Sequence, residues 1–554
     1  MLKVNAPEKC DVLIVGGGVA GLMAAIAAAE KGASVIVAEK ANTKRSGGGA
    51  NGNDHFGCYL PSYHGTVEAF INEIEQGMCK GADPKVQRVF AERSYEVLKD
   101  WEAWGINMRP FGDDYVFEGH TRPGHPGTFL KFDGSNQKKC LNEQAVKRGV
   151  KIENHTAVNR YIARDGRIVG AIAVDTSKME PEVKIYEAKS VISVTGTATR
   201  VYPMVHTTNF FNFQNCPAGT GTGRMASYEI GAEMVNYDKP RAHIGPRYFA
   251  RGGKGTWIGG ACTDINGNSL GICGRPEPGT QDITTDICSE IFDIHKKNGT
   301  GPVFMDCTEN TPEIMAHMKE GFFHEGISSL LDEMDRQDIH LEEDMIEWGR
   351  YQPHVQYSGT LINEKCETNV PGLYSAGDEV GNFFCGVSGA AVTGRIAGEQ
   401  AADYVKGVDG FVDIEGAPEI EEANAFYSSL MEREVGSYWQ EINEAVQNIM
   451  KDYASIETPR SETLLTSGIY YLEELERYAK NQVKCANAHE LMRALEAFDI
   501  LHLGRLIMIC ARDRKESRGL HKRVDYPFIN PMWNPLSMTI RKVAGEDRTE
   551  LKKI

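Results

Sequence analysis

Three glycines near the start of the chain have the spacing of a phosphate-binding turn. Gly16, Gly18 and Gly21 follow the apolar run Val12 to Val15 and open an alanine-rich stretch with helical character. Gly16 allows the tight turn, Gly18 lets the backbone approach a pyrophosphate, and Gly21 lets the helix pack closely on its strand. A second apolar run ends on Glu39, where a ribose hydroxyl would be held. The pattern indicates dinucleotide binding within a strand, helix and strand unit.

Length and composition indicate a globular protein of two or three domains. The chain has 554 residues, of which 41% are hydrophobic and 25% charged. Its net charge of −17 argues against nucleic acid or anionic membrane surfaces as partners. No apolar run approaches the ~20 residues that span a bilayer. The first strand begins ten residues from Met1, which leaves no room for a signal peptide, so we expect cytoplasmic residence.

Thirteen cysteines are dispersed without a C-x-x-C pair or the spacing of an iron–sulfur or zinc site. Such a set is typical of reduced, mostly buried thiols, and we expect no metal in the chain. If electrons reach or leave a bound cofactor singly, the relay must therefore lie on another subunit or a soluble carrier.

Four further segments resemble the flavoprotein subunits of succinate dehydrogenase, fumarate reductase, L-aspartate oxidase and adenylylsulfate reductase. They are Lys44 to Gly52, Pro371 to Asp378, Gly386 to Ala391, and Ala511 to His521 with a D-Y-P triplet after it. The resemblance implies bound FAD, an anionic small-molecule substrate, a separate iron–sulfur partner, and possible oligomers. It implies cofactor contacts from Gly16, Gly18, Gly21, Glu39, Lys40, Arg45, Ser46, Gly47, Gly48, Gly49, Ala157, Gly196, Thr222, Asp378, Ser388 and Gly389.

The fold class expected is α/β, or α+β overall. A Rossmann-like FAD-binding domain covers residues 1–240 and resumes at 353–410, and a capping domain is inserted at 241–352. Residues 411–554 form a helical C-terminal domain and an irregular tail. A hairpin-like stretch is expected from Val150 to Val174, a strand from Ser190 to Val194, and a long helix over Leu491 to Arg512.

The expected capping domain carries the strongest catalytic candidate. Arg251 to Gly255 resembles the R-G-x-G-G segment whose arginine faces the substrate in fumarate reductases and moves a proton. A guanidinium could stabilise the negative charge that hydride transfer builds on a substrate. Arg251 is the catalytic candidate and Lys254 a substrate-binding one; the alternative is a glycine-rich turn with surface cations.

A second candidate lies where the chain re-enters the FAD domain. His354 resembles the substrate-binding histidine of the dicarboxylate enzymes, although its spacing to the next glycine is one residue longer. A comparison with adenylylsulfate reductases would instead put Tyr357 at the active-site position. We treat His354 as catalytic and Tyr357 as substrate-binding; the alternative for a lone histidine is a core or surface group.

A histidine-rich loop is the third candidate. His120, Arg122 and His125 lie among prolines and glycines and could clamp an anion. A zinc site is the rival interpretation, but the H-x4-H spacing lacks cysteine partners. An ordinary ordered loop is the other alternative.

At three positions the sequence differs from the motifs of these flavoproteins, and the differences bear on FAD attachment and on the substrate. Gly47 stands where covalently flavinylated enzymes carry a histidine, so FAD should be non-covalent. Ser388 and Val392 replace the histidine and the carboxylate-gripping arginine of fumarate-type enzymes, which argues against fumarate or succinate. The function expected is an FAD-dependent oxidoreductase that exchanges two electrons with a small anion. The alternatives are an adenylylsulfate reductase alpha subunit and a non-catalytic electron-transfer module.

Overall fold

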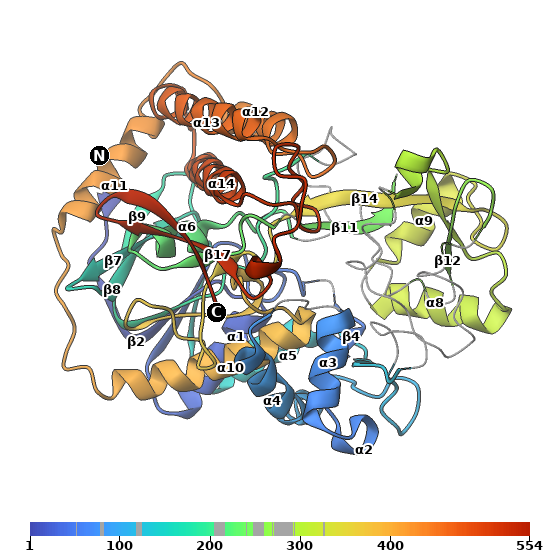
Figure 1. The fold of residues 1–554 in the computed structure, drawn as a ribbon. Coiled ribbons are helices and arrows are strands. Elements are labelled where there is room, and N and C mark those ends of the chain that lie inside the picture. Colours follow the sequence, from blue (N-terminus) through green and yellow to red (C-terminus); the bar gives the residue numbers. More distant parts are fainter. Residues whose placement is uncertain are drawn as a thin grey trace.

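The computed structural model describes residues 1–554 apart from 51, 78–81, 118–124, 204–215, 240, 248–256, 258–259, 269, 271–291, 293 and 325–326. Its largest sheet has the order β6-β3-β2-β9-β8-β7, with β1 and β16 paired to β9 (Figure 1). Strand β2 lies parallel to β3 and β9, as the predicted dinucleotide fold requires. The strands are β1 (Lys3–Val4), β2 (Glu8–Val15), β3 (Val35–Glu39), β6 (Lys151–Asn154), β7 (Thr156–Arg164), β8 (Arg167–Asp175), β9 (Glu182–Ser193) and β16 (Leu373–Ser375).

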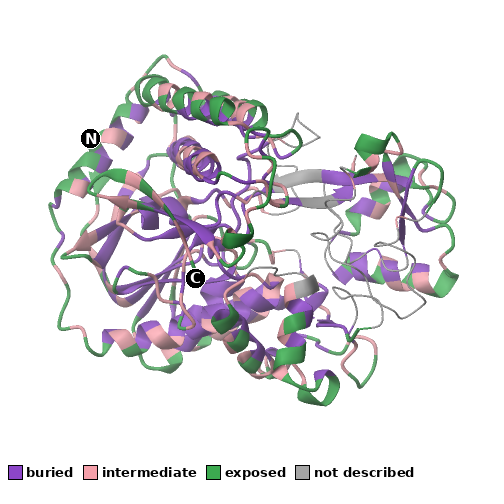
Figure 2. Cartoon of the chain, in the orientation of Figure 1, coloured by how far each residue is buried: buried purple, intermediate pink, exposed green. Residues whose placement is uncertain are grey.

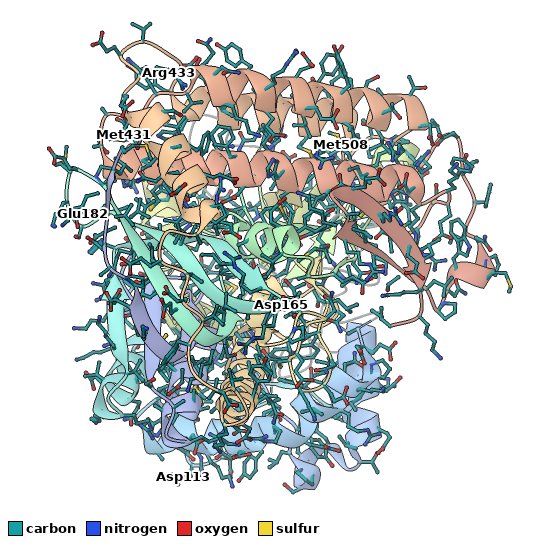
Figure 3. The ribbon with its side chains drawn as sticks, turned by 90° about the vertical axis from the view of Figure 1, so that its left-hand side faces the viewer. Asp113, Asp165, Glu182, Met431, Arg433 and Met508 are labelled. Carbon is teal, nitrogen blue, oxygen red and sulfur yellow. The ribbon has the colours of Figure 1, made fainter. Side chains whose placement is uncertain are left out.

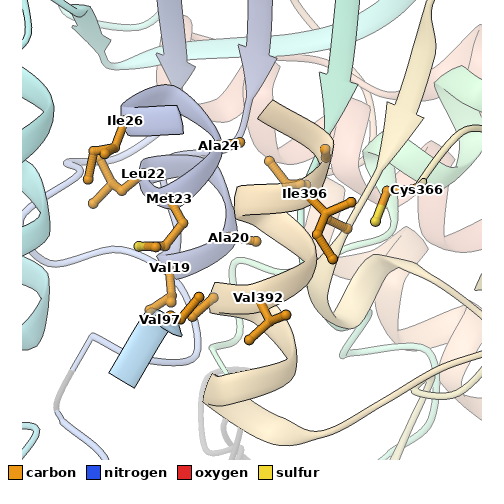
Figure 4. Close-up of a cluster of buried hydrophobic side chains, with 14 of the residues drawn as sticks. Val19, Ala20, Leu22, Met23, Ala24, Ile26, Val97, Cys366, Val392 and Ile396 are labelled. Atoms are coloured by element: carbon orange, nitrogen blue, oxygen red, sulfur yellow. The ribbon is translucent and has the colours of Figure 1, made fainter. Parts of the chain in front are cut away.

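Helices α1 (Val19–Glu30) and α10 (Gly386–Val405) pack together across one face of this sheet (Figure 4). A Cβ at Gly394 would lie 2.3 Å from the Ala20 carbonyl oxygen, and one at Gly398 would lie 2.2 Å from that of Ala24. The two backbones therefore touch at positions where a side chain has no room. The other elements on this side are β4 (His55–Gly57), α2 (Pro61–His64), α3 (Val67–Gly77), α4 (Pro84–Ala103), β5 (Phe129–Lys131) and α5 (Gln137–Lys147).

A second sheet, in the order β11-β14-β13-β12, lies apart from the first and is joined to it by the long strands β11 and β14 (Figure 1). Its core centres on Trp257, whose ring lies 5.0 Å from Trp348 and 5.2 Å from Phe322. The predicted domain limits at 241 and 352 stay a prediction; β11 begins and β14 ends close to them. The elements are β11 (Arg241–Pro246), β12 (Ala261–Thr263), β13 (Val303–Asp306), α8 (Pro312–His324), α9 (Ser329–Arg336) and β14 (Ile346–His354).

The C-terminal region is mainly helical, as predicted. Helix α14 is buried along most of its length, while α12 and α13 expose their outer faces (Figure 2). Asn487 caps α14 by accepting a hydrogen bond from the Glu490 N–H. Within the described ranges, no helix is both long and apolar enough to cross a bilayer. Its helices are α11 (Pro418–Met431), α12 (Trp439–Tyr453), α13 (Glu462–Gln482) and α14 (Ala488–Asp513), with the single turn η3 (Pro531–Trp533). Helix α6 (Thr222–Glu229) and the single turn η2 (Gly377–Glu379) come earlier in the chain.

Of two hairpins seen in Figure 3, one was predicted from the sequence and the other was not. The predicted one, β7–β8, turns at Asp165 and Gly166, which both have positive φ as a two-residue hairpin turn requires. The tail, predicted to be irregular, instead ends in a hairpin, β17 (Ser537–Val543) and β18 (Glu546–Lys552). It completes a sheet with β10 (Met234–Val235) and β15 (Gly359–Thr360), and this distant pairing is what makes the tail regular.

Candidate functional site

A cavity of about 400 Å³ runs along the carboxyl ends of the central strands and brings most of the predicted cofactor residues together. Ligands of open α/β sheets bind at this edge. The predicted cofactor residues on its wall are Gly16, Gly18, Glu39, Lys40, Arg45, Ser46, Gly47, Gly48, Gly49, Ala157, Gly196, Thr222 and Asp378.

The glycine turn before α1 has the geometry that a pyrophosphate needs. Gly16 has φ +106°, and a Cβ there would lie 2.5 Å from the Val194 carbonyl oxygen. A Cβ at Gly21 would lie 1.9 Å from the Gly16 carbonyl oxygen. At Gly18, by contrast, a Cβ would meet nothing within 4 Å and would point into open space. Gly18 thus leaves a cradle beside the N–H groups at the start of α1 that no protein atom fills, which fits a phosphate.

Glu39 is held rigidly at the end of β3. Its Oε2 accepts a hydrogen bond from the Gly17 N–H at 2.6 Å, and its Oε1 accepts one from the Ala41 N–H at 2.8 Å. Each oxygen keeps a second lone pair, so the carboxylate can still accept a ribose hydroxyl. Lys138 donates to the Gly17 carbonyl from below the turn, and burial lowers the pKa of Lys138 to about 8.

Asp378 is anchored on the opposite wall. Thr197 Oγ1 donates to its Oδ2 at 3.0 Å, and Arg224 donates to its carbonyl and, at 2.7 Å, to that of Gly196. Burial raises the pKa of Asp378. The neighbouring Glu379 is fully buried and ties η2 to the end of β9, so this stretch is fixed before any ligand arrives.

Three predicted cofactor residues lie behind the wall. Gly21 packs on the turn, as its predicted role requires. Ser388 Oγ accepts from the Gly57 N–H at 3.0 Å and donates to the Cys385 carbonyl at 2.8 Å, so it ties β4 to the start of α10. Gly389 packs against Cys385. A direct contact of Ser388 or Gly389 with the cofactor stays a prediction.

His354 and Tyr357 meet at one end of the cavity with a residue that the sequence analysis missed, Arg241. Arg241 and His354 are register partners in the β11–β14 ladder. The Arg241 guanidinium lies 3.6 Å from the centre of the Tyr357 ring, which is a cation–π contact. His354 Nε2 lies 3.0 Å from Gln356 Oε1. Tyr357 has φ 55°, a strained conformation for a non-glycine residue and one that clusters at functional sites.

A buried network behind this wall was also missed. His55, on the wall, contacts Lys131 Nζ at 2.9 Å through Nε2 and the Asp54 carboxylate through Nδ1. Lys131 Nζ also lies 2.9 Å from Asp54 Oδ2. All three side chains are buried, and the mutual contacts compensate their charges.

The remaining predicted residues do not join the described site. Arg251, Lys254, His120 and Arg122 lie outside the described residues. His125 is exposed, pairs with Glu73 Oε1 at 3.0 Å, and is absent from the cavity wall. In the part of the chain that the structure describes, no three His, Cys, Asp or Glu side chains are grouped to hold a metal ion.

The chain belongs to the FAD binding domain family, whose match spans residues 11–392. A second match, to the C-terminal region of fumarate reductase flavoproteins, covers residues 443–550. The predicted family, the cofactor FAD and the class of FAD-dependent oxidoreductase are thereby confirmed. The cradle at Gly18 and the anchored Glu39 fit this dinucleotide.

Individual relatives align with almost the whole chain, in sequence or in structure. The sequence is 24% identical to one subunit of the CoM/CoB fumarate reductase of Methanothermobacter marburgensis, over 97% of this chain and 98% of that protein. It is 24% identical to the Helicobacter pylori fumarate reductase flavoprotein subunit, over 94% and 80%. The fold matches Archaeoglobus fulgidus adenylylsulfate reductase with TM-score 0.87 at 20% identity, over 100% and 97%. Escherichia coli quinol fumarate reductase matches with TM-score 0.81 at 19% identity, over 99% and 97%.

The mode of FAD attachment can be tested directly. Gly47 lines the cavity with φ +82°, and it has no side chain that could bond to a flavin. We expect acid denaturation of the yellow protein to release all of its FAD into the supernatant, measured by absorbance. Flavin fluorescence that stays with the protein band on a denaturing gel would contradict non-covalent binding.

Proposed function

We propose that this flavoprotein exchanges two electrons with a small anionic substrate at the end of the cavity formed by Arg241, His354 and Tyr357. When bound, FAD supplies the two-electron chemistry. The observation that carries the proposal is the convergence of a guanidinium and an imidazole on one wall of the cofactor cavity.

The two groups suit different tasks. Arg241 presents a planar, permanently charged donor that Tyr357 orients by stacking, which favours a carboxylate, sulfate or phosphate group. His354 donates from Nε2 to Gln356 Oε1, since an amide oxygen can only accept, so its proton is held at Nε2. Arg241 therefore binds and orients the anion, and His354, whose Nε2 proton is held by Gln356, helps to position it.

Arg251 is retained as the predicted proton donor, with Lys254, His120 and Arg122 as predicted substrate contacts. His125, which pairs with Glu73 away from the cavity wall, is not retained. Support for Arg251 comes from its R-G-G-K-G segment, which resembles the active-site arginine segment of the fumarate reductases. Its guanidinium would stabilise charge that develops on the substrate.

An iron–sulfur protein as electron partner is also part of the proposal. The dispersed cysteines support it, as does the naming of two relatives as subunits of fumarate reductases. Cysteines dispersed without a clustered spacing are typical of proteins in a reducing compartment, so cytoplasmic residence is proposed too.

The test is reoxidation of the reduced flavin by a panel of small anions. The holoprotein is photoreduced without oxygen and mixed in a stopped-flow instrument with fumarate, adenylylsulfate and other carboxylates, sulfonates and phosphates. We expect rapid reoxidation by at least one of them and slow reoxidation by fumarate. Val392 stands where fumarate-type enzymes have an arginine that binds a substrate carboxylate, and its apolar side chain is buried against the core of α10 and α1 (Figure 4). Rapid reaction only with one-electron carriers would instead indicate an electron-transfer module.

A further inference from the structure

Helix α14 of the C-terminal region forms part of the FAD cavity, although the sequence predicts no cofactor contact on it. Met492, Leu495, Glu496 and Asp499 all lie on the wall. Their spacing of three and four residues places them on one face of the helix. This face therefore contributes two apolar and two acidic side chains to the site.

The face borders the adenosine end of the cavity. Lys40, which directly follows the ribose-binding position Glu39, donates to Glu496 Oε1 at 2.6 Å. Arg200 and Arg493 contact Glu496 Oε2 at 2.5 and 2.8 Å. Burial opposes the charged form of Glu496, yet these three cations hold its pKa at about 2. Both oxygens of Glu496 are thus used in ion pairs, and they join α14 to the residue that follows β3.

Asp499 lies one turn further along α14, and only one of its two carboxylate oxygens accepts a hydrogen bond from a described residue. Its Oδ2 accepts a hydrogen bond from Thr222 Oγ1 at 2.6 Å. Its Oδ1 makes no hydrogen bond within the described part of the chain, and it is not among the fully buried side-chain oxygens. Because Asp499 lines the cavity, this oxygen is available to a ligand there.

We propose that Asp499 recognises the adenine of FAD, with Oδ1 accepting a hydrogen bond from the exocyclic amino group while Met492 and Leu495 contact the ring. Adenine offers one amino donor on its edge and two apolar faces, which match one acceptor and two apolar side chains. The inference rests on FAD binding, which the family match shows, and not on the proposed substrate.

The surroundings of Asp499 give the recognition a pH dependence. The pKa of Asp499 is raised to about 7, mainly by burial and in smaller part by the charge of Glu496. The hydrogen bond from Thr222 and the charges of His502 and Lys40 act in the opposite direction and lower it. Tyr427 also faces this group and stays neutral, because burial raises its pKa to about 12. An amino donor stabilises the carboxylate and lowers its pKa, so FAD affinity should increase from pH 6 to pH 8.

The first experiment compares ligands on the wild-type apoprotein by flavin fluorescence quenching. Flavin hypoxanthine dinucleotide carries a carbonyl in place of the adenine amino group, and it should bind about tenfold or more weakly than FAD at pH 8, because a carboxylate would face an acceptor. Equal affinity for the two dinucleotides would overturn the proposal, and this comparison needs no variant.

Substitutions separate recognition from structure. Asp499→Leu should weaken FAD binding about tenfold while leaving the affinity for FMN, which lacks adenosine, within about twofold. Asp499→Asn retains an acceptor and should bind FAD with no dependence on pH between 6 and 8. Asp452→Leu on the exposed face of α12 is the matched control. An equal loss of FAD and FMN affinity in Asp499→Leu, or an unchanged pH dependence in Asp499→Asn, would refute adenine recognition by this residue.

Discussion

Gly18→Val should fold normally and bind no FAD. A Cβ at Gly18 meets no protein atom within 4 Å, and its φ of −67° suits any residue, so the substitution strains nothing in the protein itself. The valine side chain would fill the space that the pyrophosphate needs and would keep it from the N–H groups of α1. We expect affinity for FAD to fall at least about a hundredfold, since the charge-assisted bonds to the phosphates are lost together.

The measurement is FAD content after purification, followed by titration of the apoprotein. Circular dichroism shows whether the fold is kept. Gly407→Val, at an exposed position just after α10, is the control and should retain full FAD content. A yellow Gly18→Val protein with stoichiometric FAD would show that the pyrophosphate lies elsewhere.

Arg241→Leu should keep FAD and lose about a hundredfold in kcat/KM with the anionic substrate found in the reoxidation panel. A charge-assisted contact to an anion contributes about 1.5–3 kcal/mol, and removal of the charge leaves the bound anion without a partner. Arg241→Lys should recover only part of the loss, because lysine keeps the charge but neither the forked donor geometry nor the planar stack on Tyr357.

Arg247→Leu provides the control from the same stretch of chain. Arg247 pairs with Glu347 at 2.7 Å and is absent from the cavity wall, so its loss should leave kcat/KM within about twofold. If Arg241→Leu reacts like the wild type with every acceptor, the substrate does not bind at this end. If it loses FAD instead, the residue has a structural role.

Local patterns were enough to predict the cofactor fold. The positive φ of Gly16 and the approach of Gly21 to the Gly16 carbonyl are constraints within a few residues, and such constraints are visible in the sequence. The approach of Gly16 to Val194 is a distant contact that the sequence does not show. The β7–β8 hairpin was equally accessible, because Asp165 and Gly166 are a turn pair that tolerates positive φ.

Contacts between segments that are distant in the sequence could not be predicted from local patterns. Arg241 lines the cavity because β11 pairs with β14, more than one hundred residues later, and no spacing near Arg241 signals that contact. Asp499 meets Thr222 only because α14 packs beside α6. The β17–β18 hairpin was missed for the same reason, since its stable neighbour β10 lies about three hundred residues earlier.

The position of α14 in the cavity wall also sets when the cofactor can be loaded during synthesis. The wall joins Val15 to Asp499, so the site is incomplete until nearly the whole chain has left the ribosome. At roughly 5–20 residues per second, Asp499 is added about 25–100 s after the first residue. Until α10 has been synthesised the glycine turn has neither helix near it, and between the synthesis of α10 and that of Asp499 it still lacks α14. FAD therefore reaches its full affinity only after translation, and a chain truncated before α14 loses part of its cofactor site together with its C-terminal helices.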